Sequence, residues 1–242
     1  MAMKDLVKKV GKTSACLLES AGEVFAEKGY RDATIAEICE RAGANIAAVN
    51  YYFGDKETLY REAWLHAFRQ SITLYPPGGG VSSEAPAEER LRGYIVSAVR
   101  RITETNNREF RIIVKEMSSP TGLLEVVLGK AVLPLHRIFQ GTVRELLGPH
   151  TTDKEVEFCT FSIISQWLNP ILARAALIQK NNITTELPTE LPHISDIKAY
   201  TEHVFRFSLA GIYAYRDKAE KESSCKMAAN KSKGKGVTKT KL

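Results

Sequence analysis

Apolar residues recur at helical spacing along almost the whole chain of 242 residues. The first such segment places Leu17, Leu18, Ala21, Val24 and Phe25 on one side of a single helix. The strict alternation of apolar and polar residues that a half-buried strand requires never continues for more than a few residues. We therefore predict an all-α fold.

The same spacing predicts further helices on both sides of one break in composition. The break is PPGGGVSSEAP, residues 76–86, which is typical of a linker. Ser119-Pro120 resembles the start of a helix that ends before Gly148. Two more long helices are expected at about 154–179 and 196–216.

The composition is that of an ordinary globular protein, with 44% hydrophobic and 26% charged residues. No apolar run approaches the roughly 18 residues that a membrane span needs, and the N-terminus lacks the apolar segment of a signal peptide. The four cysteines are scattered, without metal-ligand or disulfide spacing. We expect a cytoplasmic protein that binds no metal, uses no cofactor and does not contact a membrane.

The net charge of +6 is unevenly distributed. Residues 219–242 carry seven Lys against two Glu, whereas residues 1–62 carry nine Lys and Arg against ten Asp and Glu. The segment 219–242 has no apolar period, so we expect a disordered tail that is either a solvated end or a non-specific DNA tether. The overall charge therefore does not by itself indicate DNA binding.

Two short helices, at about residues 34–40 and 46–52, are joined by a turn that contains Gly43. Thr34 and Glu37 match a capping box, and Asn45 is placed to cap the second helix. Two short helices around a Gly-containing turn are typical of a helix-turn-helix. A plain helical hairpin within a larger bundle is the alternative from spacing alone.

The sequences FAEKGYRDATIAEICERAG, NIAAVNYYF and GDKETLY give residues 13–60 a resemblance to the DNA-binding domain of the TetR family of transcriptional regulators. Ala44 and Asn50 depart from the residues that are common at their positions in that family. Later segments, FRIIVKEMSSPT and HVFRFSLAGIYAY, resemble the CecR-type subgroup. The resemblance implies a flexible basic arm at 1–12, a helix-turn-helix domain at 13–60, and a helical regulatory domain at 61–218.

The second helix of this motif carries no Lys or Arg. Base edges are recognised by hydrogen bonds and methyl contacts, which need no charge. We therefore expect base contacts, or in part phosphate contacts, from the exposed part of this helix: Asn45, Ile46, Ala47, Asn50 and Tyr51. The family resemblance assigns phosphate contacts to Thr34, Tyr52 and Lys56, and it requires Glu19, Glu23 and Glu27 to face away from DNA.

The resemblance also implies that the larger domain binds a small effector and forms a homodimer on a near-palindromic double-stranded operator. Candidate residues for the effector pocket are Phe110, Met117, His136, Gln140, Phe158 and Trp167. Candidate residues for the dimer interface are Phe161, Ile164, Leu168, Leu172, Ala176, Val204, Ser208, Gly211 and Tyr215. Each of these residues has plain core packing as its alternative.

The predicted function is that of a DNA-binding regulator, with release of a repressor from its operator by a small molecule as the expected mode. Two other classes were weighed against it. The chain has no G-x-S-x-G motif, no glycine-rich phosphate loop and no H-E-x-x-H motif, so we do not expect an enzyme. A helical adaptor that binds protein and not DNA is the remaining alternative.

Overall fold

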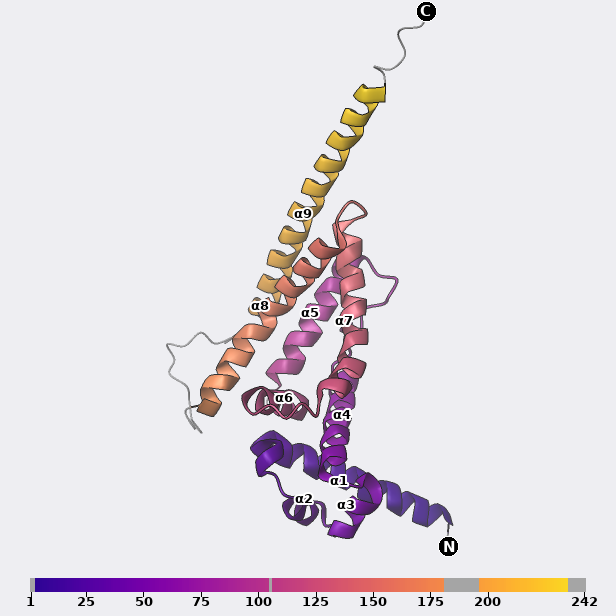
Figure 1. Cartoon of the computed structure of the whole chain (residues 1–242), viewed down its shortest axis with the longest axis vertical. Helices are drawn as coiled ribbons and strands as arrows, with labels where there is room; N and C mark the ends of the chain where they lie inside the picture. Colours follow the sequence, from indigo (N-terminus) through magenta and orange to yellow (C-terminus); the bar gives the residue numbers. More distant parts are fainter. Residues whose placement is uncertain (1–2, 105, 181–195, 235–242) are drawn as a thin grey trace, which may run out of the picture.

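The structure, a computed structural model, describes residues 3–104, 106–180 and 196–234. Over these ranges the chain forms helices and no strand, which confirms the predicted all-α fold (Figure 1). The helices are α1 (Met3–Asp32), α2 (Ile35–Ala42), α3 (Ile46–Phe53), α4 (Lys56–Leu74), α5 (Ala87–Thr103), α6 (Arg108–Ser118), α7 (Glu125–Leu147), α8 (Asp153–Lys180) and α9 (Ile197–Gly234).

The helices form an elongated molecule (Figure 1). Helices α1, α2 and α3 gather at one end, and α4 runs from them toward the body formed by α5, α7, α8 and α9. Helix α6 lies across the junction and packs against α1 and α4. None of the helices in the described part of the chain is long and apolar enough to cross a membrane.

Two hydrophobic cores hold the molecule together. The first contains Leu17, Phe25 and Ile38 of the N-terminal helices, and it extends through α4 to Ile112 of α6 and Leu124 before α7. The second is built by α5, the C-terminal half of α7, α8 and α9. The predicted domain boundary after residue 60 therefore falls inside α4 and inside the first core.

The helix at the N-terminus is longer than predicted. We expected a flexible arm over residues 1–12, but α1 begins at Met3. The segment contains no proline, and most of its residues are acceptable in a helix, so a helix that starts in the core continues back through it. Gly29 departs from helical geometry with φ 79°, a left-handed value that favours glycine, and bends the end of α1.

The predicted start of α7 at Ser119-Pro120 is wrong, because that helix begins at Glu125. The Glu116 carboxylate at the end of α6 accepts hydrogen bonds from the backbone N–H groups of Thr121 (2.7 Å) and Gly122 (3.0 Å). These contacts hold the segment after Pro120 as a turn. The start of α7 is thus set by a side chain that precedes it in the chain.

The C-terminal helix also extends beyond the predicted end at residue 216. Helix α9 continues to Gly234, so the described part of the 219–242 segment is helical and not disordered. Pairs one helical turn apart, Arg216 with Glu220 (4.0 Å) and Lys218 with Glu222 (3.9 Å), support this extension. Residues 181–195, between the two predicted long helices, and residues 235–242 lie outside the described residues.

The break at residues 76–86 packs against α5. Gly79 has φ 64°, and a Cβ atom there would lie 2.7 Å from the carbonyl oxygen of Gly93. The Ser97 hydroxyl donates to the carbonyl of Pro76 (2.5 Å). This segment is therefore a fixed connection between α4 and α5, where its composition predicted a simple linker.

Candidate DNA-binding face and ligand cavity

Local side-chain caps define the starts of α2, α3 and α4. The side-chain oxygens of Thr34, Asn45 and Asp55 each accept a hydrogen bond from the backbone N–H three residues later, at 3.2, 2.9 and 2.7 Å. Gly43 ends α2 in the left-handed conformation, with φ 61°. These caps produce the predicted helix-turn-helix.

Glu37 does more than the predicted capping box requires. Its carboxylate accepts from Lys28 of α1 (2.6 Å) and from Arg41 one turn later (2.8 Å), and Arg41 also binds Glu27 (2.8 Å). The bond from Lys28 comes first among the causes that hold the pKa of Glu37 below its usual value, with Arg41 adding to it. The cluster fixes α2 against α1.

One face of α3 is open to solvent. The exposed residues are Ile46, Ala47, Asn50 and Tyr51, and the Tyr51 side chain is 77% exposed. Val49 on the opposite side is buried in the first core. The residues expected to contact bases thus share one surface at the end of the molecule, as Figure 1 shows for the position of α3.

Most cations near this face already have partners within the chain. Lys28 and Arg41 belong to the Glu37 cluster, and the Arg31 guanidinium donates to the Ser119 hydroxyl (3.2 Å) and the Pro120 carbonyl (3.3 Å). Arg31 thereby joins the DNA-binding end to the turn after α6.

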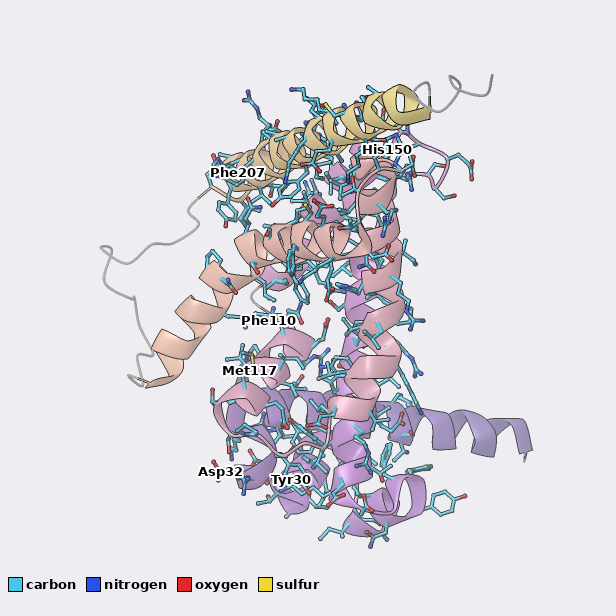
Figure 2. The ribbon with its side chains drawn as sticks, turned by 45° about the horizontal axis from the view of Figure 1, so that its top comes forward. Tyr30, Asp32, Phe110, Met117, His150 and Phe207 are labelled. Atoms are coloured by element: carbon cyan, nitrogen blue, oxygen red, sulfur yellow. The ribbon has the colours of Figure 1, made fainter. Side chains whose placement is uncertain are left out.

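Lys56 is the expected phosphate contact at the start of α4. Its Nζ atom lies 4.5 Å from the centre of the Tyr30 ring and donates to the carbonyl of Arg31 (3.5 Å). Burial lowers the pKa of Lys56, and the charge of Asp32 opposes that change. Tyr30 and Asp32 lie at this end of the molecule in Figure 2. The lysine is therefore held near the end of α1 and is half-buried.

The three acidic residues that must avoid DNA all have partners on other helices. Glu19 and Glu23 pair with Arg108 of α6, the latter at 3.6 Å, and Glu27 pairs with Arg41 of α2. Burial opposes the change, but bonds from His66 and Gln70 and the charge of Arg108 hold the pKa of Glu19 below its usual value. These contacts agree with the expectation that the carboxylates are turned toward the protein.

A cavity of about 420 Å³ lies where the two hydrophobic cores meet. Trp64 of the first core forms part of its wall, and Ile95 and Phe139 of the second core form another part. Three predicted pocket residues line it: Phe110, His136 and Trp167. A ligand there would contact both cores at once.

The other three predicted pocket residues lie elsewhere. Met117 and Phe158 are exposed on α6 and α8, and Gln140 is half-buried on α7 but does not line the cavity. Figure 2 shows Phe110 and Met117 at different positions along α6. Residues seven apart point to the same side of a helix, but Met117 lies two turns, or about 10.5 Å, further along the axis than Phe110, beyond the cavity.

Sequence reasoning missed Trp64 and Glu109 as cavity residues. Trp64 lies on the apolar side of α4 and belongs to the first core as well as to the cavity wall. Glu109 stands in the first turn of α6, where an acidic residue is usually a solvated partner of the helix dipole. Its burial comes from neighbouring helices, among them α4, whose Ser71 hydroxyl lies beside its carboxylate.

The predicted dimer residues differ in how exposed they are. Val204 and Ser208 are buried inside the protomer, so their assignment to an interface between folded protomers is wrong. Phe161, Gly211 and Tyr215 are exposed, and Ile164, Leu168 and Leu172 are half-buried. Ile164 and Leu168 also line the cavity. The side chain of Ala176 lies outside the described residues.

An exposed aromatic residue that was not predicted stands on α9. Phe207 is 64% exposed and adjoins the His203 ring at 6.0 Å (Figure 2). His203, Phe207 and Gly211 are spaced one turn apart on the open side of this helix, whereas Val204 and Ser208, each one residue further along the chain, are buried. The predicted stripe on α9 therefore combined two buried residues with the exposed Gly211 and Tyr215.

Helix α6 contacts the cavity with one side and the DNA-binding end with the other. Glu109, Phe110 and Ile113 line the cavity, whereas Arg108 pairs with Glu19 and donates to Gln70 (3.1 Å). At the other end of α6, Glu116 accepts from the buried Tyr60 hydroxyl (2.9 Å). A shift of α6 would therefore reach α1 and α4 directly.

Two families match this chain in consecutive parts. Residues 17–63 match the family described as bacterial regulatory proteins, tetR family. Residues 87–212 match the C-terminal domain of the HTH-type transcriptional dual regulator CecR. The CecR protein of Shigella flexneri is 26% identical over 193 residues, which cover 72% of this chain and 83% of that protein.

Solved structures of bacterial regulators share the fold. A transcriptional regulator from Pseudomonas aeruginosa PAO1 is 16% identical and covers 86% of this chain and 92% of its own, with a TM-score of 0.61. A TetR-like regulator from Rhodococcus sp. RHA1 is 13% identical, with a TM-score of 0.58 and coverage of 83% and 96%. At this identity the likeness concerns the arrangement of helices.

Proposed function

Because this chain belongs to the TetR family of transcriptional regulators, with a C-terminal domain of the CecR type, we propose that it represses its target genes and leaves its operator when a small molecule fills the cavity. The predicted family and subgroup are confirmed, and the protein is a DNA-binding regulator of a family that is not enzymatic. The exposed face of α3 is the single observation that carries the proposed mode of DNA contact.

The α3 face binds in the major groove, with its N-terminal residues nearest the base edges. Asn50 pairs with an adenine edge, and Ile46 and Ala47 pack against a thymine methyl group. Phosphate contacts come from Lys56, from the Tyr52 hydroxyl and from the N-terminal turns of α2 and α4, beginning with Thr34 at the cap of α2. The pairing of Lys28, Arg31 and Arg41 within the chain supports this division of roles.

The form that binds DNA is a cytoplasmic homodimer, and its operator is a near-palindrome. The half-sites lie about 34–36 Å apart, or a multiple of that, because two symmetric helices must enter the groove on one side of the duplex. The open aromatic side of α8 and α9, with Phe161 and Phe207, is the proposed contact between protomers. This face lies far from α3 (Figure 1).

A ligand in the cavity changes DNA affinity by moving α6. The residues that line the cavity lie in both hydrophobic cores, so a ligand that fills the cavity alters the separation between the two cores. Arg108 and Glu116 carry that movement to α1 and α4. A coupling free energy of about 1–3 kcal/mol is typical of such systems, which is roughly 5- to 150-fold in operator affinity.

The test is selection of fragments of the source genome with the purified protein, followed by gel retardation with the recovered operator. We expect binding to one near-palindromic site, with unrelated DNA bound far more weakly. The same complex is then screened for compounds that release the operator. An adaptor that does not bind DNA would recover no preferred fragment, and that result would contradict the proposal.

A further inference from the structure

One part of the cavity wall carries polar atoms without partners. Glu109 lines the cavity from α6 and is only 8% exposed, and its Oε2 atom is buried with no hydrogen-bond partner in the described chain. The indole N–H of Trp64, in the wall formed by α4, is buried in the same state. Buried polar groups in native proteins are nearly always paired, so an unpaired one at a cavity indicates a missing ligand group.

No neighbouring side chain in the described chain gives Glu109 Oε2 a hydrogen bond of good geometry, and the nearby Ser71 hydroxyl of α4 is itself buried without a partner. Arg101 of α5 lines the same cavity, but Oε2 receives no hydrogen bond from it, and its guanidinium carbon lies 5.8 Å from the centre of the Phe68 ring. Burial raises the pKa of the Glu109 carboxyl, while the Arg101 charge and the Ser71 hydroxyl oppose that change. His136 and Tyr94 are the other titratable side chains in the wall.

The remaining wall is rich in aromatic rings. Rings from five helices, α4 to α8, contribute to it, and they are Trp64, Tyr94, Phe110, Phe139, Phe161 and Trp167. The negative faces of such rings attract organic cations, and tryptophan does so most strongly. Around one buried carboxyl group, this wall favours a positively charged guest over a negative one.

We propose that the ligand of this cavity is an organic amine, whose ammonium group donates a hydrogen bond to Glu109 and whose apolar body lies against the aromatic wall. The proposal rests on the proposed function only in taking the cavity as the ligand site. The ammonium supplies the donor that Oε2 lacks, and the bond is strengthened because both partners are charged. Arg101 is half-exposed and keeps its own charge partly in solvent, which limits the repulsion.

Binding is measurable without DNA, because both tryptophans of the chain line the cavity. The full-length protein is titrated with 4-phenylbutylamine, 4-phenylbutanol and 4-phenylbutanoate while tryptophan fluorescence is followed. The three probes share one apolar body and differ in the head group. We expect the amine to bind most tightly and the carboxylate most weakly.

Substitution then assigns the head group. Glu109→Gln keeps the size of the side chain and removes its charge, so it should weaken amine binding about 10- to 100-fold and leave alcohol binding unchanged. Glu89→Gln is the matched control, since it removes the same charge from an exposed position on α5. It should change neither affinity.

Several outcomes would overturn the proposal. The first is that the carboxylate binds most tightly and loses this affinity on Arg101→Gln. The second is that Glu109→Gln leaves the amine affinity unchanged, and the third is that millimolar amine produces no fluorescence response. The ranking of probes on the wild-type protein decides the matter even if Glu109→Gln fails to fold. Operator release is measured separately. If the amine binds without releasing the operator, only the proposed ligand-induced release is contradicted. If a compound that is not an amine binds in the cavity and releases the operator, only the proposed amine ligand is contradicted.

Discussion

Asn45, the cap of α3, and Asn50, five residues later, are both exposed, but their side chains differ in their contacts. The Asn45 side chain accepts from the Ala48 N–H at 2.9 Å, whereas the Asn50 side chain forms no hydrogen bond within the described part of the chain. One residue therefore has a structural role already, and the other is free to contact a base.

Alanine substitutions should separate the two roles. Asn45→Ala should lower the free energy of unfolding by about 0.5–2 kcal/mol through loss of the cap. Asn50→Ala should leave thermal melting unchanged and cost about 1–3 kcal/mol of operator affinity, with relaxed preference at one position of each half-site. Melting curves and binding to a set of single-base operator variants check both. Unchanged operator binding in both variants would remove α3 from the interface.

Lys56 offers a second test at the residue scale. Lys56→Ala should weaken binding to operator and to unrelated DNA alike, and it should lower the slope of log affinity against log salt by about one per lost phosphate contact. The lysine also lies over Tyr30 and binds the Arg31 carbonyl, so melting must be measured beside binding. Tyr52→Phe, which removes only a hydroxyl, should reduce affinity without changing the salt slope. An unchanged slope for Lys56→Ala would show that this lysine does not contact phosphate.

The residues that sequence predicted well are those whose role is local. Thr34 and Asn45 are caps, and each is recognisable from its few neighbours in the chain. Glu109 escaped prediction because its burial depends on other helices, such as α4, which carries Ser71 beside its carboxylate. Val204 was placed on the wrong side of α9 because a helical period gives the spacing of a face and not its partner.

At the scale of helices, α6 contacts both the cavity and the DNA-binding end. Glu109 faces the cavity, and Arg108 beside it pairs with Glu19 of α1. The start of α7 could not be predicted from its own residues, because Glu116 of α6 fixes the turn before it. The same carboxylate also binds Tyr60 of α4. Tertiary contacts, and not helix propensity, set these boundaries.

Arg108→Gln should disconnect the ligand from DNA. With the pair to Glu19 removed, we expect the ligand-induced loss of operator affinity to fall by about 0.5–2 kcal/mol, while ligand binding followed by tryptophan fluorescence is retained. Operator affinity should be measured with and without ligand. Arg100→Gln, on the exposed side of α5, is the control and should respond as the wild type does. A full ligand response in Arg108→Gln would show that another contact, such as that of Arg31 with Ser119, transmits the change.

At the scale of the whole molecule, the Lys-rich end of α9 projects beyond the rest of the fold (Figure 1). Its described side chains after residue 219 are exposed or half-exposed, and neither core includes any of them. Removal of residues 219–242 should therefore leave the melting temperature and operator preference intact. The loss of seven lysines should weaken non-specific DNA binding and reduce its salt slope. A truncated chain that is unfolded or no longer prefers its operator would show that this extension is structural.

We expect operator binding to depend on a dimer, and the proposed surface of that dimer is the open side of α8 and α9. Phe207 is largely exposed, and it stands between His203 and Gly211 along one stripe. An aromatic residue near the centre of an interface contributes about 2 kcal/mol or more, and the two-fold axis presents each residue twice. Phe207→Arg should therefore convert the dimer to monomer at micromolar concentration, as measured by light scattering.

The monomer should retain its fold, because Phe207 lies outside both cores. It should bind a lone half-site as weakly as the wild type does and lose the gain that two linked half-sites provide. Leu74→Arg, which places the same charge at an exposed apolar position on α4, should remain dimeric and bind the full operator. If Phe207→Arg is still a dimer with wild-type operator affinity, the protomers meet elsewhere, and the exposed aromatic residues of α8, Phe158 and Phe161, become the next positions to replace.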